Sequence, residues 1–108
     1  MFGDLFDAVS LLFAQRWPVV QGEVTAVEVE RIEHRRRRDT LRLAVAYKFS
    51  IGEDGPYTGL SFWTPGRSGE NRLEAAQQKI HSGQQVVVRY RAGDPSVNVL
   101  DHGTWEGL

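Results

Sequence analysis

Apolar and polar residues alternate strictly in the last third of the chain. Val86, Val88 and Tyr90 share one phase and polar residues largely occupy the other, which is the period-two pattern of a strand with one buried face. The stretch 92–96, with glycine, aspartate, proline and serine, then favours a tight turn. Apolar residues resume at 97–100. This part of the sequence therefore predicts two strands joined by a turn.

Three further strands are predicted upstream. Residues 41–51 alternate without a fault, and a Gly- and Pro-containing turn at 52–56 joins them to a strand at 57–63. That strand has apolar residues in both phases, so it is either buried on both faces or exposes aromatics on one. Residues 19–32 form a long strand in which the apolar phase slips by one residue near Ala26, as a β-bulge produces.

Two helices complete the predicted set. Residues 1–16 carry an apolar stripe that ends at Trp17-Pro18, because the residue before proline disfavours the α region. The stripe either packs on the domain's own sheet or contacts a partner protein or a second copy. A membrane-surface helix is the weaker alternative, since its polar face offers few basic residues. The members of the stripe are Phe2, Leu5, Phe6, Val9, Leu12 and Phe13.

The second helix lies between the third and fourth strands. Asn71 with Glu74 has the spacing of a capping box, and Gly83 suits the position that follows a helix. Leu73, Ala76, Gln77 and Ile80 would place a narrow, mostly apolar stripe on one face of this helix. The fold class is therefore mainly β with two helices (α+β). It is a small antiparallel five-stranded barrel or curled sheet with the OB-like order β-β-β-α-β-β, preceded by an N-terminal amphipathic helix.

The domain organisation follows from these elements. We expect an N-terminal amphipathic helix at 1–16, a single β-rich domain at 17–103, and a tail at 104–108 that frays unless Trp105 ties it down. One domain is also what 108 residues allow.

Composition narrows the class of protein. There are no cysteines, which excludes a disulfide scaffold and a thiolate zinc site. No basic n-region opens the chain and no apolar run approaches the roughly 20 residues of a spanning helix. We therefore expect a soluble, cytoplasmic protein that does not insert into a membrane, with peripheral membrane contact left open. The net charge of −1 attracts neither nucleic acid nor anionic lipid, so only a local patch could do so.

The sharpest local feature is the run Arg35, Arg36, Arg37 and Arg38 in the link between the first two strands. The planar guanidinium fork suits phosphate, and in OB-type barrels this loop contacts nucleic acid. Tyr57, Phe62 and Trp63 are candidate platforms for stacking bases. The alternative is a solvated hairpin tip that nearby acidic residues neutralise, among them Glu28, Glu30, Glu33 and Asp39.

Catalytic and metal-binding signatures are lacking. The three histidines, at 34, 81 and 102, have no partners at metal-ligand spacing, and no phosphate loop or nucleophile elbow occurs. The sequence predicts no catalytic residue, no metal, no cofactor and no enzymatic activity.

Several short motifs occur in a recognisable order. Trp17 precedes Gly22-x-Val24, then come Tyr47-x-Phe49 and Tyr57-x-Gly59, an alanine-bearing helix at 75–76, the run 83–90 with its alternating valines, and Asp94-Pro95-Ser96 ending in Leu100. Together they resemble the domain-of-unknown-function 3592 family over residues 17–103. The resemblance supplies no activity and no site residues. Many members of that family look like membrane proteins with a hydrophobic helix before the tryptophan, whereas this chain has an amphipathic segment there.

Two functions follow as hypotheses from this sequence. The leading one is a non-enzymatic protein-interaction module that uses the N-terminal apolar stripe, with a homodimer or an unidentified protein as partner. The second is binding of single-stranded nucleic acid or another polyanion through Arg35 to Arg38 with Tyr57 and Trp63.

Overall fold

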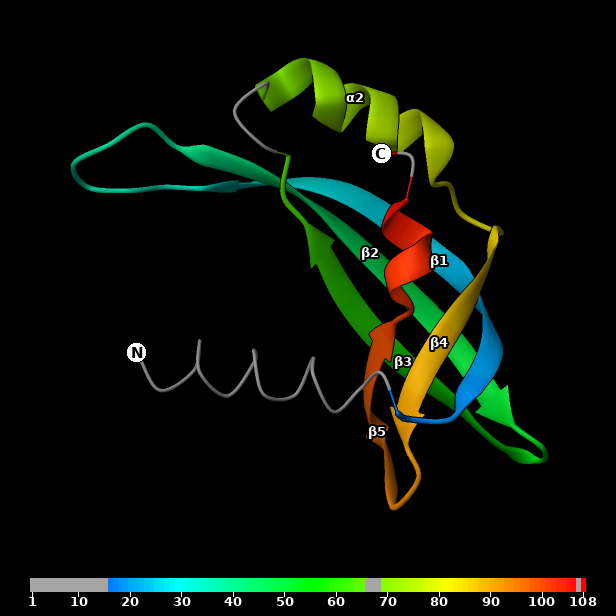
Figure 1. Cartoon of the computed structure of the whole chain (residues 1–108). Helices are drawn as coiled ribbons and strands as arrows, with labels where there is room; N and C mark the ends of the chain where they lie inside the picture. Colours follow the sequence, from blue (N-terminus) through cyan, green and yellow to red (C-terminus); the bar gives the residue numbers. More distant parts are fainter. Residues whose placement is uncertain (1–15, 66–68, 107) are drawn as a thin grey trace.

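The computed structural model describes residues 16–65, 69–106 and 108. Five antiparallel strands form one sheet in the order β3-β2-β1-β4-β5 (Figure 1). One α-helix lies between β3 and β4, and a short 3₁₀ helix follows β5. The elements are β1 (Val19–Ile32), β2 (Thr40–Ile51), β3 (Asp54–Trp63), α2 (Gly69–Lys79), β4 (Gln85–Arg91), β5 (Asp94–Leu100) and η1 (His102–Trp105).

The two edge strands of this sheet approach each other. The side-chain amide of Asn98 on β5 donates to the Thr58 carbonyl on β3 at 3.3 Å, and the Leu100 amide donates to the Ser61 hydroxyl at 3.4 Å. The sheet is therefore a nearly closed barrel, with β5 beside β3. The mainly-β, five-stranded prediction is confirmed, and the barrel-like form replaces the open-sheet alternative.

The predicted bulge in β1 is present. The pairing with β2 shifts register between Val24 and Ala26. Val24, before the shift, is 1% exposed, and Val27, after it, packs against the core from the other phase. The extra residue brings Val27 to the core as the strand bends, whereas Val29, two residues further along, is 40% exposed.

The core lies inside the barrel and under α2. The helix covers one end of the sheet (Figure 1). Leu73, Ala76 and Ile80 of the predicted stripe are buried, whereas Gln77, its polar member, is exposed. The strand residues in the core are those that the alternating pattern predicts to face inward. Its strand residues are Val24, Leu43, Val45, Tyr47, Phe49, Val86, Val88 and Leu100.

Two predictions about helices need correction. The described residues contain one α-helix rather than two, because the helix predicted over 1–16 falls almost wholly outside them. In addition, α2 begins at Gly69, so Asn71 is internal and the capping box is wrong. A cap contributes only about 1 kcal/mol, and packing of the apolar face stabilises a short helix more. Gly83 lies in the turn before β4 with φ +88°, beyond the helix end at Lys79.

The chain end packs rather than extending into solvent. Trp105 and Leu108 contact the core, and Arg72 donates to the Leu108 carbonyl at 3.1 Å. The Asp101 carboxylate caps η1 by accepting from the Gly103 amide. None of the helices in the described ranges has the length and apolarity that a membrane crossing requires.

Candidate binding surfaces

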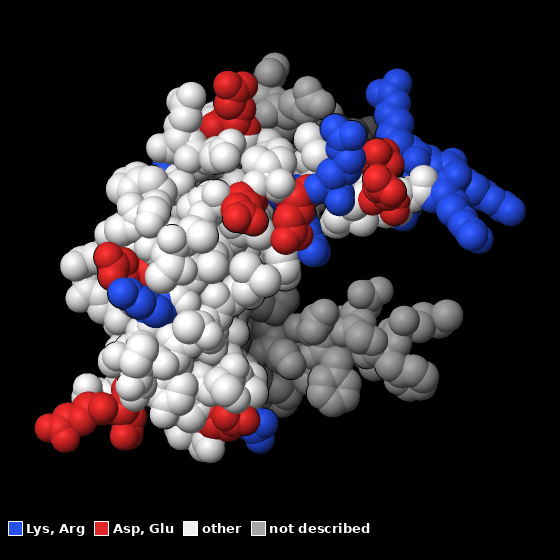
Figure 2. Space-filling model, turned by 180° about the vertical axis from the view of Figure 1, so that it is seen from behind, with Lys and Arg blue, Asp and Glu red and all other residues white. Residues whose placement is uncertain are grey.

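The β1–β2 hairpin projects from the barrel as an arm (Figure 1). Pairing continues to Ile32 opposite Thr40, and residues 33–39 form its tip. We call residues 29–43 the hairpin arm. Arg35 to Arg38 all lie at the tip and are exposed. Figure 2 shows a gathering of basic side chains at this end of the molecule, with acidic side chains directly beside them. The arm thus presents a concentrated positive charge on a protein of nearly neutral net charge.

None of these arginines forms an ion pair within residues 16–65, 69–106 and 108, although Glu33 and Asp39 lie in the same tip. The Glu30 carboxylate pairs instead with Arg42, at 2.9 Å. The other ion pairs between described residues, at Lys48–Glu23 and Arg89–Asp101, lie away from the arm. His34 bonds to the Thr40 hydroxyl at 3.0 Å and so closes the base of the tip. The tip arginines remain available to an external anion.

The predicted aromatic platforms do not gather beside the arginines. Tyr57 lies opposite Phe49, at the end of β2 away from the arm, and their rings stack with centroids 5.6 Å apart. Trp63 lies opposite Leu43, nearer the arm, and packs against the core with the Arg72 guanidinium 5.7 Å from its ring. The structure therefore brings Trp63 toward the arm and leaves Tyr57 far from it.

Phe62 is the most exposed of the three candidate aromatics. It is 41% exposed, on the outer face of β3 near the base of the arm. The Arg42 guanidinium sits 3.7 Å from the centre of its ring, and Glu30 holds that guanidinium from the neighbouring strand. Alternation along the sequence predicts that Phe62 and Arg42 each point outward from the sheet. That they meet depends on the register between β2 and β3, which the sequence does not show.

A second surface is apolar. Leu60 and Phe62 on β3 are 54% and 41% exposed, and Val97 on β5 is 38% exposed. They point outward, whereas Tyr57 and Trp63 on the other phase of β3 point inward. We call Leu60, Phe62 and Val97 the outer apolar face. The protein-contact candidates Phe2, Leu5, Phe6, Val9, Leu12 and Phe13 lie outside the described residues.

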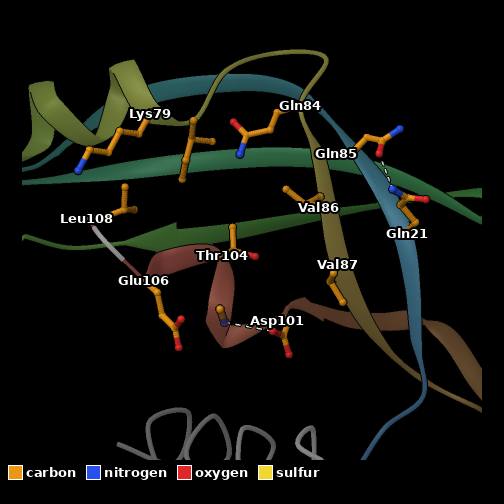
Figure 3. A pocket seen from close by; sticks show the side chains of 12 residues that line it. Gln21, Lys79, Gln84, Gln85, Val86, Val87, Asp101, Thr104, Glu106 and Leu108 are labelled. Atoms are coloured by element: carbon orange, nitrogen blue, oxygen red, sulfur yellow. Dashed lines mark hydrogen bonds between the residues drawn. The ribbon is translucent and has the colours of Figure 1, made fainter.

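An open depression of about 470 Å³ lies between the end of α2, β4 and η1 (Figure 3). Ile80 and Val86 are among the residues that line it, and the side chains of Lys79, Gln84 and Glu106 stand around it. Asp101 also borders it, but its carboxylate already bonds Arg89 and the Gly103 amide. Within the described part of the chain, no three metal-ligating side chains come together.

Two titratable groups are shifted, and both have structural causes. The hydrogen bond from Arg89, more than any other contact, lowers the pKa of Asp101 below its usual range. Burial raises the pKa of the Tyr47 hydroxyl, against a smaller opposing effect of its hydrogen bond with Ser61. The Asp101 shift thus reflects an ion pair near the chain end, and the Tyr47 shift reflects burial in the barrel core.

These observations define a small, nearly closed antiparallel β-barrel with a basic hairpin arm. The chain belongs to the family described as domain of unknown function (DUF3592), whose sequence pattern matches residues 20–105. The resemblance seen in the sequence motifs is thereby confirmed. No curated protein and no solved structure matches the chain.

Proposed function

We propose that this domain is a non-enzymatic binding module whose hairpin arm binds single-stranded nucleic acid. One observation carries the proposal. Arg35 to Arg38 are exposed at the end of a projecting hairpin, and no described acidic side chain pairs with them. Arginine donates bidentate hydrogen bonds to phosphate, and closely spaced positive charge gains further from release of condensed counterions.

The architecture supports this choice of ligand. Following the hydrogen-bonded order and then the β3–β5 contact, the strands run 1-2-3-5-4 around the barrel. This order is typical of OB-type barrels, in which the loop between the first two strands contacts oligonucleotides. Phe62, with Arg42 over its ring, offers a partly exposed stacking surface at the base of the arm. Phe62 replaces Tyr57 in the proposed site, because Tyr57 is distant from the tip.

Contact with a partner protein is the second candidate. The outer apolar face favours it, since monomers rarely leave contiguous apolar patches uncovered. In that case the N-terminal stripe would join the face in binding an unidentified protein or a second copy. Either function needs no cofactor and no catalysis, and we expect either to operate in the cytoplasm.

Fluorescence anisotropy of labelled oligothymidine and oligouridine, titrated with the full chain at low and moderate salt, tests the first proposal. We expect binding that weakens as salt rises, and at least tenfold weaker binding for the variant Arg36→Ser/Arg37→Ser. The matched control is Arg16→Ser/Arg91→Ser, which removes the same charge from exposed positions outside the arm. Absence of binding at low salt, or equal loss in both variants, would overturn the proposal.

A further inference from the structure

We propose that the guanidinium of Arg42 is a platform on which an unpaired base stacks, with Phe62 supporting it and Glu30 positioning it. The inference rests on the proposed function and deepens it, because it names the group that contacts the base. The tip arginines need only phosphate, whereas this platform needs a base. The ligand class is therefore an unpaired nucleic-acid strand, as opposed to any chain of negative charges.

The three residues come from three adjacent strands and share the outer face of the sheet. Glu30 on β1 pairs with Arg42 on β2, and Phe62 on β3 pairs with Ala44, the next outward position along β2. This register places Arg42 diagonally beside Phe62, within reach of a long side chain. The Arg42 guanidinium carbon accordingly lies 3.7 Å from the centre of the Phe62 ring. A planar cation at that distance packs against one face of the ring.

Glu30 fixes the orientation of this guanidinium. Its Oε2 atom accepts from Nε of Arg42 at 2.9 Å and lies 2.9 Å from Nη2. Two contacts along one edge of a planar fork hold it against rotation. Phe62 thus covers one face of the guanidinium and Glu30 covers one edge, yet the Arg42 side chain is still 32% exposed. The exposure that remains lies away from these two residues, where a base can stack on the guanidinium plane.

The ion pair with Glu30 separates the role of Arg42 from that of the tip arginines. The carboxylate balances the charge of Arg42, so a phosphate gains less from this guanidinium than from Arg35 to Arg38, which form no ion pair with a described residue. Stacking uses the planar face and does not need net charge. Phe62, itself 41% exposed, extends the platform beside the guanidinium. The arm therefore carries two kinds of contact, with phosphate at the tip and with a base where the arm joins the barrel.

The two contacts lie close enough for one strand of nucleic acid to make both. Arg42 is two residues from Thr40, which pairs with Ile32 at the start of the tip. Two residues of a strand span about 7 Å. Nearby nucleotides of a single strand can therefore place a base on Arg42 and phosphates at the tip. A duplex keeps its base faces stacked inside, and a base-free polyanion has no such face to offer.

Anisotropy titrations of the full chain with two labelled oligomers of equal length test the base contact. One is oligothymidine and the other is the abasic oligomer with the same phosphates. We expect the parent to bind oligothymidine at least about tenfold more tightly. Arg42→Lys keeps the charge and loses the planar face, so it should remove most of this preference without changing the affinity for the abasic oligomer. The control is Arg91→Lys, at an exposed position outside the arm, which should keep the preference of the parent.

The outcomes separate this inference from the proposed function. If the parent binds neither oligomer at low salt, both are wrong. If it binds the two oligomers equally, the tip still binds phosphate and only the base contact is excluded. A preference for oligothymidine that survives Arg42→Lys would also overturn the platform.

A second set of variants tests the positioning role of Glu30. Glu30→Ala releases the guanidinium, so we expect a weaker preference for oligothymidine and a slope of log K against log salt more negative by about 0.7, as the freed charge reaches phosphate. Glu30→Gln retains a side-chain oxygen that accepts from Nε and should keep most of the preference. Glu28→Ala is the matched control, because it removes the same charge at the preceding outward position of β1 and should leave the preference unchanged. An unchanged preference in Glu30→Ala would overturn the role assigned to Glu30.

Discussion

The Tyr47 hydroxyl on β2 donates a 2.6 Å hydrogen bond to the side-chain oxygen of Asn98 on β5. These strands are not neighbours in the hydrogen-bonded order, so the bond spans the gap at which the barrel closes. The Asn98 amide nitrogen in turn donates to the carbonyls of Pro95, Ser96 and Thr58. One asparagine thus joins its own turn, the β3 edge and the barrel interior.

Removal of the Tyr47 hydroxyl should weaken this closure. Tyr47 is 1% exposed, so Tyr47→Phe leaves the side-chain oxygen of Asn98 without its buried hydrogen-bond donor. We expect a loss of about 1–2 kcal/mol in the free energy of unfolding, measured by urea denaturation. The control is Tyr57→Phe, whose hydroxyl makes no hydrogen bond to a described residue, and it should change stability by less than about 0.5 kcal/mol. Equal effects of the two variants would contradict this role of Tyr47.

The contact between Tyr47 and Asn98 also requires that residue 59 on β3 has no side chain. A Cβ atom at this position would overlap the Tyr47 ring and hydroxyl and the Asn98 side chain. We therefore expect Gly59→Ala to destabilise the domain by about 1–3 kcal/mol, the cost of forcing extra atoms into a packed site. Gly93→Ala is the matched control, because nothing lies within 4 Å of its added Cβ. The urea midpoints of the two variants measure this difference. If Gly59→Ala is as stable as Gly93→Ala, the space between Gly59, Tyr47 and Asn98 is wider than in the structure.

Local patterns predict most of this fold. The bulge in β1 is visible because a one-residue slip moves every later side chain to the other face, and Val24 and Val27 lie on either side of that slip. The buried stripe of α2 follows from the helical period in the same way. Both patterns involve residues only a few positions apart along the chain, so the sequence shows them directly.

The relationships between distant strands could not be predicted. Tyr57 and Trp63 share a phase on β3, but whether either lies near the arginines depends on which ends of β2 and β3 meet the arm. The Tyr47–Asn98 bond joins residues 51 positions apart, and no local pattern specifies it. For the candidate site, the sequence therefore predicts the arginine tip and three candidate aromatics, but not which of the three lies near the arm.

The Arg89–Asp101 pair predicts a pH dependence. Their side chains approach to 2.5 Å and are 28% and 24% exposed. Because the folded pKa of Asp101 lies below the ordinary value of 3.8, the pair stabilises the fold above about pH 4. That contribution is lost as the pH falls through the lowered folded pKa. We expect Asp101→Asn to be less stable than the parent by about 1 kcal/mol at pH 7, with the two curves converging toward pH 2. A constant difference across that range in urea titrations would exclude a charge-based contribution.

The salt dependence of binding should report how many arm arginines meet phosphate. Each phosphate contact on single-stranded DNA contributes about −0.7 to the slope of log K against log salt concentration. Because Arg36 and Arg37 have no described acidic partner, we expect Arg36→Ser to make the slope less negative by about 0.7. The variant Phe62→Ser should weaken binding at every salt concentration and leave the slope unchanged, because stacking releases no counterions. Anisotropy titrations at four or more salt concentrations measure both slopes. If Arg36→Ser lowers affinity without changing the slope, the tip does not contact phosphate directly, and the arm acts by shaping the surface around Phe62.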